Sequence, residues 1–400
     1  MGMETDALII SAVRTPSGRF QGGLGSIPAT KLGAIAVRAA VERAGIRTED
    51  IDEVLLGNVV QAGEGQAPAR QAAMGAGVPA AVGATTINKV CGSSLKAAML
   101  ASQAIRAGDA SLMVAGGFES MSRAPFLVSG RTGELRFGNQ QLTDALLVDG
   151  LWDSFENWGM GQAAEFIADE YEVTREAMDR FSLQSHQKAV AAQEAGRFKA
   201  EIVPVEIRGR KGEITTLEVD EGPRKDASLE SLANLKASFR SNGRVTAGNS
   251  SSMNDGAAAV VIASRAYAGK HHLHPMARVV GYAQAAVEPK YLFAAPAHAI
   301  PKLLQKIGWT LSEVDLIDLN EAFAAQVLAD GYALADQGWD WAKVNVNGGA
   351  IALGHPLGAS GARVLTTLLH ALKDRGLKRG LAALCLGGGE AVAMAVEMEH

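Results

Sequence analysis

Asn88-Lys89-Val90-Cys91-Gly92-Ser93-Ser94-Leu95-Lys96 is the stretch that decides the fold, because it places a cysteine directly in front of a helix. The residues that follow are rich in alanine and predict a long helix that ends at Gly108. At a helix N-terminus, free N–H groups and the helix dipole favour negative charge. We therefore expect the pKa of the Cys91 thiol to be lowered, which favours the nucleophilic thiolate. We also expect Gly92, which has no side chain, to let a substrate carbonyl approach the backbone.

Taken alone, Cys91 is better explained as a small buried residue, because unpaired cysteine is among the most buried residue types. The alternative, that Cys91 is a nucleophile, gains support from Cys385, which lies nearly three hundred residues further along the chain. These two are the only cysteines, which argues against a disulfide framework and favours a reducing compartment. The acidic start, Met1–Asp6, is neither a signal peptide nor a transit peptide, so we expect a cytoplasmic location.

Length and composition indicate a globular chain with more than one unit. Its 400 residues exceed the roughly 250–300 that one hydrophobic core usually holds, so we expect two similar domains or one domain with an insertion. The net charge of −5 argues against a nucleic-acid partner. No apolar run approaches the length of about 20 residues that spans a membrane. His271, His272 and His274 have no cysteine or acidic partner at a suitable spacing, so we expect no metal site.

Short apolar runs alternate with alanine-rich helical patterns along the chain. Continuous apolar runs suit strands that are buried on both faces, which is typical of layered α/β proteins. The predicted strands are residues 7–13, 53–60, 111–116, 257–263, 278–283, 316–319, 381–386 and 392–397.

The chain also contains an internal repeat. In residues 44–57 and again in 307–320, a glycine follows a predicted helix, and a short polar stretch then leads into a strand. Two copies of one α/β unit would place a site between the halves. Residues 119–245 differ in character, with several aromatic residues and two predicted helices, 162–171 and 174 to about 198. We expect an insertion that lies over the site as a lid, and a purely oligomerising role is the alternative.

Three polar motifs in the second half end strands or begin helices. His355 lies between Gly354 and Pro356 on a rigid turn, where an imidazole can act as a base or as an oxyanion donor. Cys385 is followed by a run of glycines with unobstructed backbone N–H groups, and Asn320-Glu321-Ala322-Phe323 ends another strand. Together with Cys91, these groups could share one face of a cleft.

With residues 13–16, 195–198 and 248–256, these motifs resemble the thiolases, the acyl-CoA:acetyl-CoA acyltransferases, over essentially the whole chain. The resemblance implies an α/β protein with the five-layered αβαβα thiolase fold, two duplicated halves and an inserted loop domain. It also implies a homodimer or homotetramer. The implied divisions are 1–118 plus 246–272 for the N-terminal half, 119–245 for the loop domain that covers coenzyme A, and 273–400 for the C-terminal half.

The resemblance implies a role for each catalytic group. Cys91 resembles the nucleophile that takes the acyl group as a thioester, and His355 resembles its base. Cys385 resembles the second acid/base, which removes the α-proton of acetyl-CoA. Asn320 resembles the residue that holds a water, which with His355 makes one oxyanion hole. The N–H groups of Cys91 and Gly387 would make the other.

The substrates that the resemblance implies are acetyl-CoA, acetoacetyl-CoA or another 3-ketoacyl-CoA, and coenzyme A, with no cofactor. An exposed surface charge remains the alternative for Arg224, and a simple turn the alternative for Ser251. The positions assigned to substrate and coenzyme A are Met160, Arg224, Ser231, Phe239, Ser251 and Phe323.

Two departures leave the acyl chain length open. Short-chain biosynthetic thiolases have a histidine directly before the Met-Gly pair, where this chain has Trp158 and Gly159, and Ser252 stands where glycine is usual. We expect the residues at both of these places to lie beside the acyl chain and the pantetheine of the bound substrate. The resemblance therefore implies an acetyl-CoA acetyltransferase, with a 3-ketoacyl-CoA thiolase of β-oxidation as the alternative.

Two other classes of protein remain as alternatives to a thiolase. A ketosynthase-like condensing enzyme would pair its cysteine with two histidines, or with a histidine and an asparagine, so Cys385 argues against it. A coenzyme A- or lipid-binding protein that had lost its chemistry would lack at least one of Cys91, His355 and Cys385, and all three are present.

Overall fold

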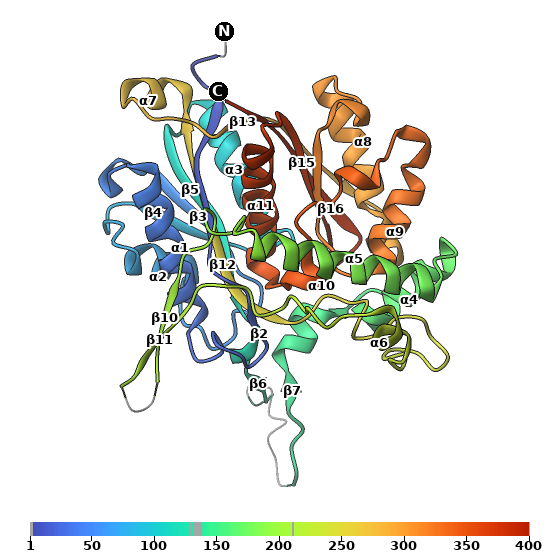
Figure 1. Ribbon diagram of the computed structural model, residues 1–400. Coiled ribbons are helices and arrows are strands. Elements are labelled where there is room, and N and C mark those ends of the chain that lie inside the picture. Colours follow the sequence, from blue (N-terminus) through green and yellow to red (C-terminus); the bar gives the residue numbers. More distant parts are fainter. Residues whose placement is uncertain (1–2, 129, 131–137, 210–211, 400) are drawn as a thin grey trace.

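Two β-sheets with a pair of helices between them form the frame of the computed structural model, which describes residues 3–128, 130, 138–209 and 212–399 (Figure 1). In order across the N-terminal sheet lie β1 (Ala7–Arg14), β12 (Asn254–Ser264), β5 (Leu112–Ser120), β3 (Glu53–Gly57) and β4 (Gly83–Ile87), with the short β2 (Gly18–Arg19) on β12. The C-terminal sheet has the order β14 (Leu316–Leu319), β15 (Arg379–Leu386), β16 (Glu390–Met398) and β13 (Ala277–Ala286).

Helices form the other three layers. The middle layer is α3 (Ser93–Ala107) and α11 (Ser360–Arg375), and both contact strands of both sheets. On the outside, α1 (Ala29–Ala44) and α2 (Pro68–Gly75) cover the N-terminal sheet, while α8 (Pro296–Ile307) covers the C-terminal sheet beside α9 (Ala324–Ala333) (Figure 1). The five-layered αβαβα arrangement is therefore confirmed.

The internal repeat is visible as repeated local structure. α1 ends at Gly45 and α8 at Gly308, with φ angles of 66° and 71° that suit glycine. A 3₁₀ turn follows each glycine and leads into β3 and β14, respectively. The two sheets join into one continuous ten-stranded sheet of the described chain where β1 pairs with β13, at Leu8 with Arg278 and at Ile9 with Ala277.

All eight predicted strands are present, and most of them extend a few residues beyond the predicted bounds. Two differences have a clear physical cause. β3 ends at Gly57 rather than at Val60, because the carboxylate of Glu119 accepts the N–H groups of Val59 and Val60 in place of a neighbouring strand. The edge strand β4 was not predicted. Its sequence, Gly-Ala-Thr-Thr-Ile, is short and partly exposed, so it lacks the apolar signal on which the other predictions rest.

The inserted segment contributes α4 (Met160–Glu170), α5 (Arg175–Glu194), α6 (Leu229–Ala233) and three two-stranded hairpins: β6 (Phe126–Leu127) with β7 (Thr143–Asp144), β8 (Trp152–Asp153) with β9 (Trp158–Gly159), and β10 (Val205–Arg208) with β11 (Ile214–Leu217). The side chain of Thr174 caps α5 by accepting the N–H of Ala177. α5 ends a few residues earlier than predicted. The boundaries drawn around residues 119–245 stay a prediction.

A buried charge cluster attaches the insertion to the N-terminal sheet. Arg14, at the end of β1, donates to Glu201 at 2.6 Å and to both carboxylate oxygens of Asp220 at 2.6 and 2.8 Å. All three side chains are almost inaccessible to solvent. Because a buried charge must be paired, these contacts hold the insertion in place.

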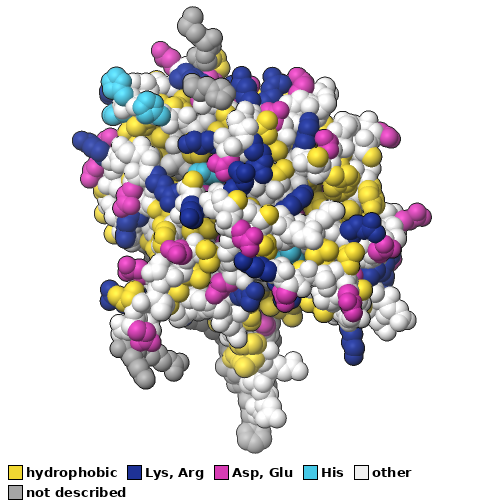
Figure 2. Space-filling model, in the orientation of Figure 1, with side chains coloured by type: hydrophobic (Ala, Val, Ile, Leu, Met, Phe, Trp, Pro, Cys, Tyr) yellow, Lys and Arg dark blue, Asp and Glu magenta, His cyan; other side chains and the backbone are white. Residues whose placement is uncertain are grey.

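The described surface carries charges of both signs. On the face shown in Figure 2, lysine and arginine side chains are interspersed with aspartate and glutamate, without a continuous basic patch. Among the described residues, no helix combines the length and the apolar character needed to cross a bilayer.

Candidate active site

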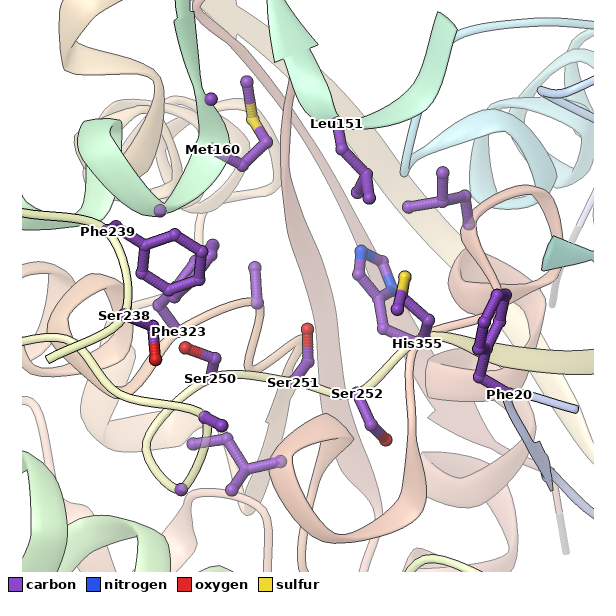
Figure 3. Close-up of a pocket in the computed structure, with 18 of the residues that line it drawn as sticks. Phe20, Leu151, Met160, Ser238, Phe239, Ser250, Ser251, Ser252, Phe323 and His355 are labelled. Atoms are coloured by element: carbon purple, nitrogen blue, oxygen red, sulfur yellow. The ribbon is translucent and has the colours of Figure 1, made fainter. Parts of the chain in front are cut away.

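A cavity of about 980 Å³ lies between the two halves and beneath the inserted segment. Every predicted site residue except Asn320 lines it. The predicted residues in its wall are Cys91, Met160, Arg224, Ser231, Phe239, Ser251, Phe323, His355, Cys385 and Gly387. The close-up in Figure 3 shows His355 in the middle of the cavity, with Met160, Phe239 and Phe323 on one side and Phe20 on the other.

Cys91 lies two residues before α3, as the sequence predicts, but its thiol is not acidic. Burial raises the pKa of Cys91 to about 12, although the N–H groups of Gly387 and of Cys91 itself donate toward the sulfur and oppose this rise. The expectation of a lowered pKa is therefore wrong for the free protein, because the loss of hydration outweighs the helix terminus. Val90, directly before the cysteine, has a φ of 45°, a strained conformation for a β-branched residue.

Gly92 is required for packing. A Cβ at this position would lie 2.3 Å from Cδ2 of Leu386 and 2.9 Å from Cγ2 of Val392. The absent side chain thus lets the start of α3 pack closely against β15, which contains Cys385, and against β16, which follows it. The approach of a substrate carbonyl at Gly92 stays a prediction.

His355 is held as a neutral base with one free nitrogen. Its Nδ1 lies 2.6 Å from Oγ of Ser360, and that hydroxyl donates its own proton to the carbonyl of Pro356 at 2.9 Å. The hydroxyl oxygen must therefore accept from Nδ1–H, which leaves the lone pair on Nε2. Nε2 is buried without a partner among the described residues. Burial, with a contribution from the Arg363 charge, lowers the pKa of His355 to about 3.

The backbone at His355 is anchored through Asn254. Oδ1 of Asn254 accepts the N–H of His355 at 3.1 Å and the hydroxyl of Ser252 at 2.7 Å. Gly354 has a φ of 96°, and a Cβ there would lie 2.3 Å from Cγ of Asn254. The unusual Ser252 therefore supports the amide that positions the histidine, a role that the sequence did not suggest.

Cys385 lies at the end of β15, with only 1% of its surface exposed. Burial raises the pKa of Cys385 well above its usual value, and the charges of Cys91 and Asp330 act in the same direction. The glycines that follow turn the chain into β16, with φ angles of 84° at Gly388 and 83° at Gly389. The resting group is therefore a thiol beside a partly buried glycine turn.

Asn320 and Glu321 lie behind the cavity wall and differ in their contacts. Neither amide atom of Asn320 has a partner among the described residues, although the side chain is fully buried. Such an amide is readily satisfied by a bound water. The carboxylate of Glu321 instead accepts from Ser185, Asn345 and the N–H of Ile351, so it ties loops together and is not free to orient a water.

One end of the cavity carries basic side chains, two of which the sequence analysis did not single out. Arg19 and His186 line the wall together with Arg224. Nδ1 of His186 accepts the N–H of Arg224 at 3.3 Å, and burial together with the charges of Arg224 and Arg19 lowers the pKa of His186 to about 4. No sequence signal marked Arg19 or His186, because strand β2 and helix α5 meet here only in the folded chain.

The wall around the acyl position is apolar and differs from the prediction at Trp158. That indole packs against Phe166 with ring centroids 5.6 Å apart and does not line the cavity. Gly159 does line it, because neighbouring residues of the β8–β9 hairpin face opposite ways. Leu147, Leu151 and Trp152 complete this part of the wall.

The arrangement combines the partly buried thiol of Cys91, a neutral imidazole, the buried thiol of Cys385 and two backbone N–H groups. It can therefore support transfer of an acyl group to Cys91, with stabilisation of a negatively charged oxygen. Both cysteines are free. Within the described ranges, no three histidine, cysteine or acidic side chains are grouped so that they could hold a metal ion.

Comparison with known families gives matches along nearly the whole chain. The model described as thiolase, N-terminal domain, matches residues 7–266. The model described as thiolase, C-terminal domain, matches residues 273–398.

Individual proteins are similar over the same length. An acetyl-CoA acetyltransferase of Cupriavidus necator is 53% identical over 393 residues, covering 98% of this chain and 99% of the relative. A probable acetyl-CoA acetyltransferase of Escherichia coli is 51% identical over 99% of this chain and 100% of its own. The crystal structure of the Bacillus anthracis acetyl-CoA acetyltransferase superposes with a TM-score of 0.95 at 41% identity, covering 98% of this chain and 99% of that one.

Proposed function

The chain belongs to the thiolase family, and we propose that it joins two molecules of acetyl-CoA into acetoacetyl-CoA and coenzyme A, and catalyses the reverse thiolysis. The observation that carries this proposal is the meeting of Cys91, His355 and Cys385, from three separate motifs, in the wall of one cavity. Relatives about half identical over the full chain carry the name of this activity.

In the first step, Nε2 of His355 takes the proton of the Cys91 thiol while the sulfur attacks the carbonyl carbon of acetyl-CoA. The N–H groups of Cys91 and Gly387 stabilise the negative oxygen that forms. The carbon–sulfur bond to coenzyme A then breaks, and Cys385 gives its proton to the departing thiolate. The enzyme is left with an acetyl-Cys91 thioester, a protonated His355 and a Cys385 thiolate.

In the second step, the Cys385 thiolate removes a proton from the methyl group of a second acetyl-CoA. The enolate oxygen is stabilised by His355 and by a water held on Asn320, whose free amide supports this assignment. The enolate carbon attacks the acetyl group, the bond to Cys91 breaks, and His355 returns the proton to Cys91. All groups are then back in their resting states, with no cofactor consumed.

Thiolysis of acetoacetyl-CoA by coenzyme A, followed through loss of the 3-ketoacyl-CoA absorbance, tests the proposal. Cys91→Ala should abolish turnover and the labelling of the protein by radioactive acetyl-CoA. Cys385→Ser should still accept the label while losing condensation. A wild-type protein that takes no label would contradict the proposal and favour a binding protein.

A second candidate activity is thiolysis of longer 3-ketoacyl-CoA substrates, and Gly159 is the observation that favours it. The glycine leaves that side of the cavity open, next to the apolar Leu147, Leu151 and Trp152. The nearest heavy atom to a Cβ placed at Gly159 is Oε1 of Gln162, 3.7 Å away, so a Cβ fits there without a clash.

Gly159→His tests this candidate directly. We expect the variant to keep its kcat/KM for acetoacetyl-CoA and to lose about tenfold in kcat/KM for a medium-chain 3-ketoacyl-CoA, because one filled subsite is worth about 1–3 kcal/mol. A wild-type protein that shows no activity on the longer substrate would limit the function to acetyl transfer.

For coenzyme A, we propose that the phosphates lie against Arg19 and Arg224, at the cationic end of the cavity, with Ser231 nearby.

The remaining proposals concern assembly and location. We propose a homodimer or homotetramer. The edge of the N-terminal sheet at β4, which pairs with no further strand among the described residues, supports this, because an unpaired strand edge can pair with a second copy. Light scattering would contradict this if it gave the mass of one chain. The cytoplasmic location stays a prediction.

A further inference from the structure

Glu119 is a fully buried carboxylate that the reaction described above does not use. It lies near the end of β5, with 0% of its surface exposed, and it does not line the cavity. Burial raises the pKa of Glu119 to about 7, while N–H groups that donate to it oppose the rise. A protein keeps such a costly group where its hydrogen bonds are needed.

The hydrogen bonds of Glu119 join the two halves of the molecule. One oxygen accepts the N–H of Val59 at 3.1 Å and the N–H of Gly358 at 2.9 Å. The other accepts the N–H of Val60 at 3.1 Å and the side-chain amide of Asn58 at 3.2 Å. Residues 58–60 follow β3 in the N-terminal half, whereas Gly358 lies three residues after His355 in the C-terminal half.

The backbones at this junction touch, so the carboxylate sets their spacing. A Cβ at Gly358 would lie 2.7 Å from the carbonyl oxygen of Phe118 and 2.9 Å from the Glu119 carboxylate. A Cβ at Gly117 would lie 2.1 Å from the carbonyl oxygen of Gly358. Because no side chains lie between these backbones, a change in the length or charge of residue 119 should shift the loop that carries His355.

The charge of Glu119 also affects the pKa of the Cys91 thiol. It contributes, after burial, to the raised pKa of the Cys91 thiol. The other carboxylate that acts on Glu119 is Glu64, from the segment after β3, which shares the amide of Asn58 as a donor at 3.4 Å. Removal of the Glu119 charge should therefore make the Cys91 thiol more acidic.

We propose that Glu119 is a positioning residue for the reaction: its carboxylate joins the segment after β3 to the His355 loop, and so fixes the imidazole relative to Cys91. The inference rests on the proposed function for its kinetic consequences. Its effect on the thiol does not depend on turnover.

The test separates charge from length by two variants and a control. Glu119→Gln removes the charge and keeps the size, whereas Glu119→Asp keeps the charge and shortens the side chain. Glu165→Gln is the control, because Glu165 is equally buried and accepts the N–H groups of Arg244 and Val245 at 2.8 Å, away from Cys91. Alkylation by iodoacetamide is measured against pH in a Cys385→Ser background, where Cys91 is the only thiol.

We expect Glu119→Gln to shift the alkylation profile to lower pH and Glu119→Asp to leave it in place. Both should lower kcat for acetoacetyl-CoA thiolysis at least tenfold while KM changes less than threefold. Glu165→Gln should lower the melting temperature without either effect.

Three results would overturn the inference. The first is a folded Glu119→Asp variant with kcat within twofold of the wild type. The second is an unshifted alkylation profile for Glu119→Gln. The third is failure of both variants to fold, which would assign Glu119 to folding alone. A wild-type protein without thiolysis would instead contradict the proposed function, and the alkylation profiles would still decide the role of Glu119.

Discussion

At the scale of single residues, one hydrogen bond decides which nitrogen of His355 can act as a base. Ser360 accepts from Nδ1–H because its own proton is donated to Pro356, and Nε2 is left free. Ser360→Ala removes this constraint on the tautomer and on the ring orientation. We expect kcat for thiolysis to fall by about 10²-fold, with KM nearly unchanged, since misplacement of a catalytic group costs about that much.

Ser102→Ala is the matched control for this measurement. Ser102 is also fully buried, but its hydroxyl donates to the carbonyl of Ala98 within α3. The control should keep its kcat. Equal losses in both variants would mean that Ser360 contributes only to packing.

The protonation of Cys91 leads to a prediction about pH. The pKa of Cys91 is raised to about 12, and that of His355 is lowered to about 3, so both groups are neutral in the free protein near neutral pH. Because only the thiolate reacts, the alkylation rate of Cys91 should rise about tenfold for each pH unit between about pH 7 and 10. A plateau near neutrality, as a thiolate–imidazolium pair would give, would contradict the assignment.

Sequence predicts which residues meet at the site better than it predicts their chemistry. Cys91, His355 and Cys385 could be found because each stands in a distinctive motif beside glycines. The pKa of Cys91 could not, because it depends on burial by Leu386 and its neighbours, which are distant in the chain. Arg19 and His186 carry no motif at all, and only the folded chain brings them together.

At the scale of secondary-structure elements, the attachment of the insertion to β1 depends on Arg14. Asp220→Ala leaves this buried guanidinium with one carboxylate instead of two. We expect the free energy of unfolding to fall by about 3–5 kcal/mol, since loss of a partner leaves an uncompensated buried charge. Thermal and urea unfolding would measure the loss.

The surface pair of Lys225 with Glu194 provides the control for that loss. Both side chains are more than half exposed. Glu194→Ala should change the free energy of unfolding by less than about 1 kcal/mol. A similar small change for Asp220→Ala would show that the insertion is held by other contacts.

The elements themselves follow from the sequence wherever burial is complete. β14 has the predicted bounds, Leu316–Leu319, because it is covered on both faces. β4 was missed because an exposed edge strand has no continuous apolar run. Trp158 was wrongly placed beside the acyl chain, because the short hairpin of β8 and β9 that turns its indole away from the cavity has no sequence signature.

At the scale of the whole molecule, the active site is divided between the two repeated halves. Cys91 comes from the first half, while Asn320, His355 and Cys385 come from the second. The duplication could be read from residues 44–57 and 307–320, but the contact between the halves could not. It depends on how α3 and α11 pack between the sheets.

This division has a practical consequence at the link between α7 (Arg265–Lys270) and β13. The exposed His272 lies in that link, so the chain can be separated there into residues 1–272 and 273–400. Neither polypeptide alone carries a complete set of catalytic groups, and co-expression of the two should restore thiolysis. Activity of either polypeptide by itself would contradict the division. Once the two polypeptides assemble, the loss of 3-ketoacyl-CoA absorbance reports the association of two separately encoded chains.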